Sequence, residues 1–183
     1  MGASGNVTIN ETVTAGNNVT MDAGAGIALN GAVTAANDVS LKAKGGDITT
    51  TKAVKATTGN VSMDASENVS IGETVDAGNN VNMTAGAGIA LNGAVTAAND
   101  VLLKANGGDI TTTAIATTTG KNVTMNASKA ITLNGAVTAD NDVSLKANSG
   151  DITTTAKVAA TNGNVTMGAS GNVTINETVT AGN

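Results

Sequence analysis

The sequence predicts an all-β protein: a right-handed parallel β-solenoid with about 20–22 residues and three short strands per coil. Three observations predict this fold. Sequence phrases recur at fixed offsets, apolar and polar residues alternate within each repeat, and Gly and Asn separate the alternating segments. Helix is disfavoured because β-branched residues dominate, glycine recurs, and no stripe with a 3.6-residue period persists. A strand that returns parallel to itself is normally connected by a right-handed crossover.

The coils are defined by phrases that return along the chain. LNGAVTA begins at Leu29, Leu91 and Leu133, so the offsets of 62 and 42 residues are sums of 20 and 22. We expect eight full coils over 16–181, five of 20 and three of 22 residues: 16–35, 36–57, 58–77, 78–97, 98–119, 120–139, 140–161 and 162–181. Residues 1–15 form a partial coil and 182–183 begin the next, so 1–183 is read as a single continuous solenoid segment.

Each coil carries three segments with a period of two, at 19–23, 27–29 and 33–35 in the first full coil. Their alternate residues are expected to point inward and to stack on the equivalent residues of the next coil. The fourth position of a coil is Val, and the sixth is Met in short coils and Leu in long ones. These two core columns contain Val19, Val39, Val61, Val81, Val101, Val123, Val143 and Val165, and Met21, Leu41, Met63, Met83, Leu103, Met125, Leu145 and Met167.

A polar column occupies the third position, at a corner of every coil. It is Asn in short coils and Asp in long ones: Asn18, Asp38, Asn60, Asn80, Asp100, Asn122, Asp142 and Asn164. We interpret this column as a structural ladder, in which stacked side chains bond to one another and to the backbone, rather than as a row of metal ligands.

The two extra residues of each long coil are expected before Ile48, Ile110 or Ile152 and around the Thr-Thr-Thr runs such as 49–51. Ile115 lies one place early relative to Val54 and Val158, which predicts a local bulge or a shifted corner.

The composition excludes several classes of function. Nine Lys against fourteen Asp and Glu give a net charge of −5, which argues against nucleic acid or an anionic membrane as a partner. No apolar run approaches the ~20 residues of a membrane span, so no membrane insertion is expected. The chain has no Cys, His, Arg or aromatic residue, and its acidic residues are dispersed. We therefore expect no catalytic site, no cofactor and no metal site, and not an enzyme.

Four weaker patterns have structural alternatives. The Gly-Gly-Asp turns at 45–47 and 107–109 suggest calcium, but the nine-residue period of calcium-binding repeats is missing. The Thr runs suggest ice binding, but short coils interrupt them. Opposite charges at Asp22, Lys42 and Asp64 fit register specification on a solvated face. Sequons such as Asn6, Asn18, Asn122 and Asn164 follow from the Asn-Val-Thr texture, so they support glycosylation weakly.

Runs such as GNNVTMDAGAGIALNGAVTA and NDVSLKANSGDITTTA resemble the repeats of filamentous-haemagglutinin-type adhesins, the surface proteins exported by two-partner secretion. The resemblance covers essentially the whole chain but rests on repeat texture. It implies right-handed β-helices on the outside of Gram-negative bacteria, of which this chain resembles the shaft alone. We therefore expect a structural segment of an extracellular fibre or adhesin stalk. The alternative is a binding face for carbohydrate or a cell-surface receptor.

Residues 1–17 are identical to residues 167–183, so the pattern closes on itself after 166 residues. We expect a window on a longer tandem array with a 166-residue super-repeat, in which Met1 occupies the sixth-position column. The expected partner is the chain itself, by axial continuation that we favour as covalent, with lateral bundling as a second form of self-association.

Overall fold

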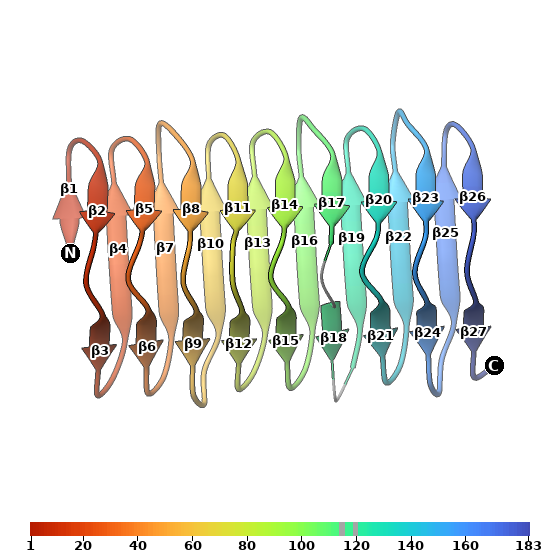
Figure 1. Cartoon of the computed structure of the whole chain (residues 1–183), viewed down its shortest axis with the longest axis horizontal. Coiled ribbons are helices and arrows are strands. Elements are labelled where there is room, and N and C mark those ends of the chain that lie inside the picture. The colour runs from red at the N-terminus through yellow and green to blue at the C-terminus, as the bar shows by residue number, and fades with distance from the viewer. Residues whose placement is uncertain (114–115, 119–120) are drawn as a thin grey trace.

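The computed structural model describes residues 1–113, 116–118 and 121–183. In these residues the regular structure is β-strand throughout, and the strands pair in parallel to form three nine-stranded sheets. The sheets run side by side along the length of the molecule (Figure 1). The predicted all-β parallel solenoid, with three strands per coil, is confirmed.

Sheet 1 holds the longest strands of each coil. It comprises β1 (Gly2–Ala3), β4 (Val19–Ala23), β7 (Val39–Ala43), β10 (Val61–Ala65), β13 (Val81–Ala85), β16 (Val101–Ala105), β19 (Val123–Ala127), β22 (Val143–Ala147) and β25 (Val165–Ala169). Sheet 2 comprises β2 (Val7–Ile9), β5 (Ile27–Leu29), β8 (Ile48–Thr50), β11 (Val69–Ile71), β14 (Ile89–Leu91), β17 (Ile110–Thr112), β20 (Ile131–Leu133), β23 (Ile152–Thr154) and β26 (Val173–Ile175). Sheet 3 comprises β3 (Val13–Ala15), β6 (Val33–Ala35), β9 (Val54–Ala56), β12 (Val75–Ala77), β15 (Val95–Ala97), β18 (Ala116–Thr118), β21 (Val137–Ala139), β24 (Val158–Ala160) and β27 (Val179–Ala181).

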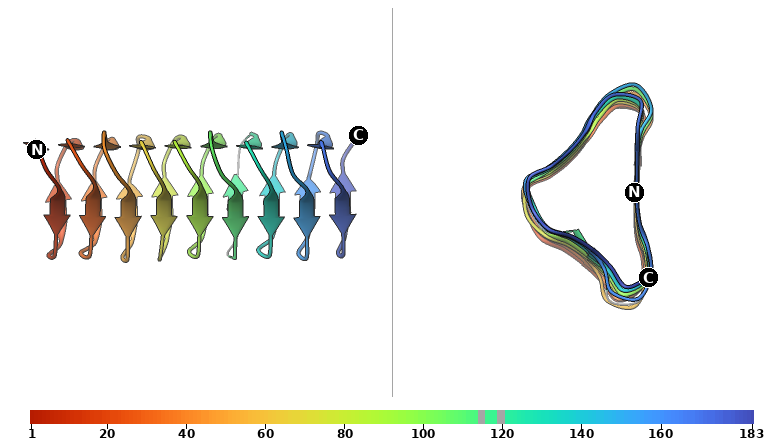
Figure 2. Two further views of the ribbon diagram at one scale, coloured as in Figure 1. Left: turned by 90° about the horizontal axis from the view of Figure 1, so that it is seen from above. Right: turned by 90° about the vertical axis from the view of Figure 1, so that its right-hand side faces the viewer.

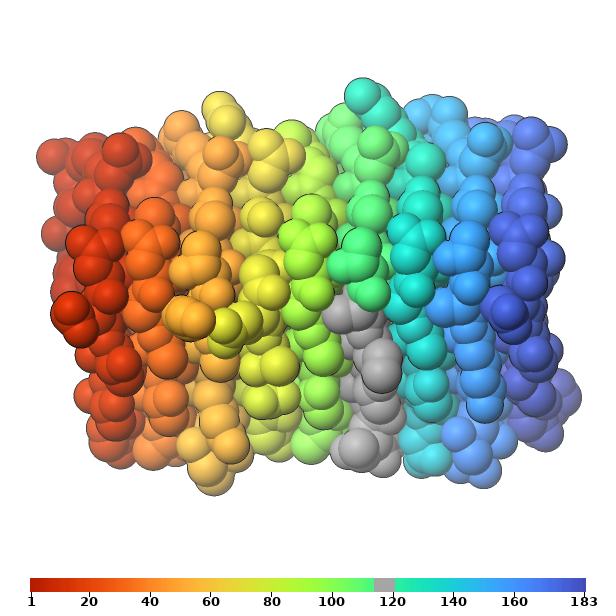
Figure 3. All heavy atoms as spheres, viewed as in Figure 1, coloured from red at the N-terminus to blue at the C-terminus, as the bar shows by residue number. Residues whose placement is uncertain are grey.

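The coil is right-handed, as predicted. In Figure 1 the strands of sheets 2 and 3 run down the page in front, those of sheet 1 run up behind, and the chain advances from left to right. Seen along the axis in Figure 2, successive coils superimpose on a three-sided outline whose straight side is sheet 1. The space-filling view in Figure 3 shows the outer surface of sheets 2 and 3 as successive bands, one per coil.

Equivalent residues of successive coils stack directly on one another. In sheet 1, Val39 pairs with Val19 on one side and Val61 on the other, and their side chains are at most 6% exposed. Along each strand buried residues alternate with more exposed ones, as at Val19–Ala23. Val165 and Met167 pair in register with Val143 and Leu145 but are only partly buried, because β25 has a neighbouring strand on one side alone.

Glycine is required where the corners of neighbouring coils approach closely. A Cβ at Gly31 or Gly93 would overlap the carbonyl of Glu11 or Glu73 in the preceding coil. Among the described residues no glycine has a positive φ, so these Asn-Gly corners need glycine for close approach rather than for a left-handed backbone.

The prediction for the extra residues of the long coils is half right. One extra residue does lie before Ile48, because four residues join β7 to β8 whereas three join β4 to β5. The other does not lie around the Thr run, since Thr50 pairs with Leu29 and Val54 pairs with Val33 across equal connections. It lies in the corner 57–60 between β9 and β10, which is four residues long where the corner after β6 has three. The predicted irregularity at Ile115 falls outside the described residues.

Candidate functional site

The third-position column forms a continuous side-chain ladder. In every step the side-chain Oδ1 of one coil accepts a hydrogen bond from the backbone N–H of the equivalent residue in the next coil, at 2.8–3.2 Å. The residues so linked are Asn18, Asp38, Asn60, Asn80, Asp100, Asn122, Asp142 and Asn164. Where the next residue is Asn, its Nδ2 donates to the same oxygen, as Asn122 does to Asp100 at 3.0 Å. A backbone N–H is therefore satisfied at each corner of the ladder, which is a structural task.

A second, interrupted ladder lies at the corner before sheet 2. Asp47 Oδ1 accepts from Asn68 N at 2.8 Å, and Asn68 Oδ1 accepts from Gly88 N at 3.0 Å. Asp109 and Asp151 accept in the same way from the next coil. One carboxylate oxygen of each Gly-Gly-Asp turn at 45–47 and 107–109 is thus committed to holding the following coil.

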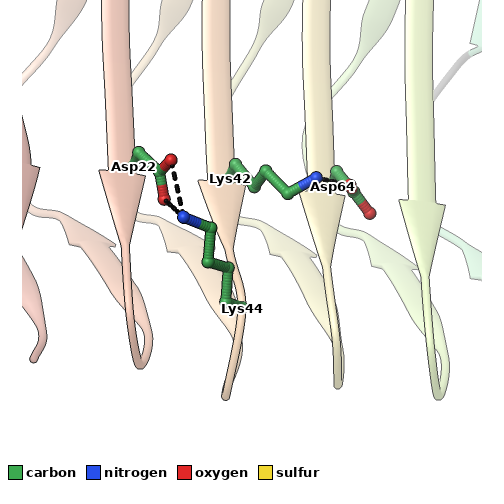
Figure 4. Close-up of polar contacts among 4 residues, drawn as sticks. All are labelled: Asp22, Lys42, Lys44 and Asp64. Carbon is green, nitrogen blue, oxygen red and sulfur yellow. Dashed lines mark hydrogen bonds and ion pairs between the residues drawn. The ribbon is translucent and has the colours of Figure 1, made fainter. Parts of the chain in front are cut away.

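Ion pairs on the outer face of sheet 1 join neighbouring coils, but not in the predicted order (Figure 4). Lys42 Nζ pairs with Asp64 at 3.1 Å, as predicted, whereas Asp22 pairs with Lys44 at 2.8 Å rather than with Lys42. A single ammonium reaches one of its two neighbouring carboxylates, and Lys44, in the corner after β7, is long enough to reach the other. All four side chains are about half exposed, so each pair contributes little to stability.

A further pair links corners between sheets 2 and 3. Lys52 Nζ donates to Glu73 Oε1 at 2.9 Å. The hydrogen bond to Glu73, and then its charge, raise the pKa of Lys52 above its ordinary value. The pair is solvated, and it acts as a contact between adjacent coils rather than as a reactive group.

In the Thr runs 49–51, 111–113 and 153–155 the middle residue is a core residue, which the alternation alone had not been used to predict. Thr50, Thr112 and Thr154 are at most 1% exposed, and their hydroxyls have no hydrogen-bond partner among the residues that the structure describes. Each stands in the inward column of sheet 2 between Leu or Ile neighbours; Thr50, for example, pairs with Leu29 and Ile71. The signal was present in the alternation, because Thr50 is two residues after Ile48 just as Leu29 is two after Ile27.

Two equivalent shallow grooves lie over the outer face of sheet 2. One, of about 320 Å³, is lined by Thr8, Gly26, Ala28, Asp47 and Thr49 among others. The other, of about 380 Å³, is lined by the residues 62 positions later, including Ser70, Gly88, Ala90 and Asp109. Both occur where the outward residue of a sheet 2 strand is Ala and the paired residues of the two neighbouring strands are the larger Ser or Thr. In coil 120–139 Thr132 occupies the position of Ala28 and Ala90.

The described residues contain no group of three or more potential acidic, His or Cys metal ligands. Within the same part of the chain, no helix is long and apolar enough to cross a membrane. The sequon residues Asn6, Asn18 and Asn122 have their Oδ1 atoms engaged in the ladders. That the chain has no catalytic site, no cofactor and no metal site therefore stays a prediction. The side chains that the fold brings together are those of the ladders, which run along the axis of the solenoid.

Comparison with protein-family models, curated protein sequences and solved structures finds no match for the chain. The parallel solenoid is therefore established by the structure alone. The resemblance to filamentous-haemagglutinin repeats rests on the sequence pattern.

Proposed function

We propose that this chain is a structural segment of an extracellular fibre or adhesin stalk of the filamentous-haemagglutinin type. The observation that carries the proposal is the run of three parallel sheets along the described length, with interior and corner ladders in register. The backbone hydrogen bonds of these sheets point along the axis, so a load along the axis is shared among three strands at every coil boundary. Equivalent residues stacked in register give a rod of nearly constant cross-section, which suits a shaft (Figure 2).

The proposal includes a cell-surface location and no enzymatic role. Antibodies against the folded chain should label intact cells of the source organism as strongly as permeabilised ones. Labelling that requires permeabilisation would overturn the extracellular assignment.

We also propose that the partner is the chain itself, continuing along the axis. The identity of residues 1–17 and 167–183 supports this, because a chain that repeats after 166 residues would continue with the same order of short and long coils. Fibres dissolved in hot detergent or strong acid should yield chains far heavier than 17.6 kDa if continuation is covalent. A dominant species at 17.6 kDa would contradict the covalent form and favour non-covalent stacking.

A second candidate function is recognition of carbohydrate or a cell-surface receptor, and the two equivalent grooves favour it. They place hydroxyl, amide and carboxylate groups around a recessed Ala at two sites three coils apart. Glycan-array binding by the folded chain tests this candidate. The double variant Ala28→Thr/Ala90→Thr should abolish binding while leaving the fold intact, since Thr132 already occupies the equivalent rung. If the wild-type chain binds no glycan, the second candidate is rejected and the structural role in a shaft is the one that remains.

A further inference from the structure

The chain contains five Asn-Gly dipeptides, beginning at Asn30, Asn92, Asn106, Asn134 and Asn162. Asparagine is a chemically labile residue, and a following glycine leaves the next backbone nitrogen sterically open. Such a nitrogen can attack the asparagine side chain only if the amide can rotate toward it. The structure can therefore rank five sites that the sequence makes equivalent.

The two Asn-Gly sites at 30 and 134 are held by the preceding or following coil. Asn30 Nδ2 donates to Asn10 Oδ1 at 2.9 Å, and Asn134 Oδ1 accepts from Thr155 Oγ1 at 2.9 Å. The glycine nitrogens at both sites are also engaged, because Gly31 and Gly135 donate to carbonyls of the preceding coil at 3.3 and 3.2 Å. Both the electrophile and the nucleophile are thus restrained.

The sites at 92 and 162 are restrained through the side chain. Asn92 Oδ1 accepts from Thr113 Oγ1 at 3.3 Å. Asn162 Nδ2 donates to Asp140 Oδ1 at 2.8 Å, a charge-assisted bond. Rotation of either amide toward the next nitrogen would break an existing bond.

Asn106 differs from the other four asparagines in its hydrogen bonds. It is exposed, as they are, and lies in the corner between β16 and β17, where only its backbone N–H is engaged, with Ala85 O at 2.9 Å. Within the described residues, neither its side chain nor the backbone nitrogen of Gly107 makes a hydrogen bond. The equivalent corners of the other long coils are anchored: Lys44 pairs with Asp22, and Asn148 Nδ2 donates to Asn126 Oδ1 at 2.8 Å.

We propose that Asn106 is a site of spontaneous deamidation in the folded protein. The nitrogen of Gly107 forms a bond to Cγ of Asn106, the Cγ–Nδ2 bond breaks, and ammonia leaves. Water then opens the resulting succinimide at either carbonyl, giving aspartate or isoaspartate; the net reaction consumes one water and releases one ammonia. The product adds a negative charge at the corner 106–109, which is one residue longer than the short-coil corner 24–26. This inference does not depend on the proposed function.

Mass spectrometry tests the ranking directly. The folded chain and a urea-unfolded sample are incubated in mildly alkaline buffer, then unfolded and cleaved after lysine. The five sites fall in five different peptides: 1–42, 56–104, 105–121, 130–146 and 158–183. In the unfolded sample all five should deamidate at comparable rates. In the folded sample peptide 105–121 should keep its rate, while the other four slow by about tenfold or more, equivalent to about 1.4 kcal/mol of activation free energy.

A matched variant separates structure from local sequence. Ser149→Gly creates an Asn-Gly dipeptide at 148, whose side chain is anchored to Asn126 and to the Ala127 carbonyl. Asn148 should deamidate quickly in the unfolded variant and slowly in the folded one, whereas Gly107→Ser should slow Asn106 in both states. Equal folded-state rates at Asn106 and Asn148 of the Ser149→Gly variant, or a slow Asn106 in the folded wild type, would overturn the proposal.

Discussion

The short and long coils enclose the same core with different residues. Coil 16–35 and coil 36–57 each bury seven inward side chains: Val19, Met21, Ala23, Ile27, Leu29, Val33 and Ala35 in the first, and Val39, Leu41, Ala43, Ile48, Thr50, Val54 and Ala56 in the second. The two extra residues of the long coil lie in corners, so they add no inward position. The long coil also replaces Leu29 by the smaller Thr50. Coil length is therefore a property of the corners, and the core tolerates it because every inward position keeps its register.

The largest effect is expected from placing a charge in the sixth-position column. Met63→Asp and Leu41→Asp should each destabilise the fold by several kcal/mol, because an unpaired carboxylate would replace a side chain that is 1% exposed. Ser62→Asp, on the outward side of the same strand, should change stability by less than ~0.5 kcal/mol. Urea denaturation measures all three, and similar losses for Met63→Asp and Ser62→Asp would contradict the inside and outside assignment.

Next in size is the ladder residue that distinguishes long coils. Asp100→Ala should cost about 1–3 kcal/mol, because it removes the acceptor shared by the backbone N–H and Nδ2 of Asn122. Asp100→Asn keeps an oxygen at this position, so it should cost distinctly less. If the two variants have the same unfolding free energy, the side-chain ladder does not stabilise the corner.

The buried threonines give an effect of opposite sign. Thr50→Val should raise the unfolding free energy by about 1 kcal/mol, because it replaces an unpaired buried hydroxyl with a methyl group of similar size. Thr49→Val, on the exposed side of β8, serves as the control and should be nearly neutral. A loss of stability in Thr50→Val would show that the hydroxyl has a partner in solution, such as an enclosed water.

The surface ion pairs should have the smallest effect. Asp64→Asn removes the pair with Lys42, and Asp22→Asn removes the pair with Lys44. Because all four groups are about half exposed, each variant should lose only a few tenths of a kcal/mol, and less at high salt. A loss of unfolding free energy above ~1 kcal/mol would mean that these ion pairs help to set the register of neighbouring coils.

The sequence was sufficient for features that repeat in every coil. Alternation at positions such as Val19 and Met21 follows from strand geometry, and the Asn18 ladder follows from stacking like on like. The sequence was insufficient where two side chains compete for the same ion-pair partner, or where a polar residue occupies an inward position of the alternation. Asp22 lies next to both Lys42 and Lys44, and only the three-dimensional path of the corner decides between them. The hydroxyl of Thr50 favours a surface position, whereas its place in the alternation is that of Leu29, and packing decides for the core.

The central claim is that equivalent residues of successive coils lie directly on one another, and a pair of engineered disulfides tests it most directly. Ser40 and Ser62 are partners in β7 and β10 on the outward side, about 4.8 Å apart as neighbouring strands, which a disulfide can span. The double variant Ser40→Cys/Ser62→Cys should oxidise quantitatively without loss of stability. Ser40→Cys/Asn82→Cys, which skips one coil, should stay reduced. Efficient oxidation of the second pair, or failure of the first, would contradict the stacked register on which the whole account depends.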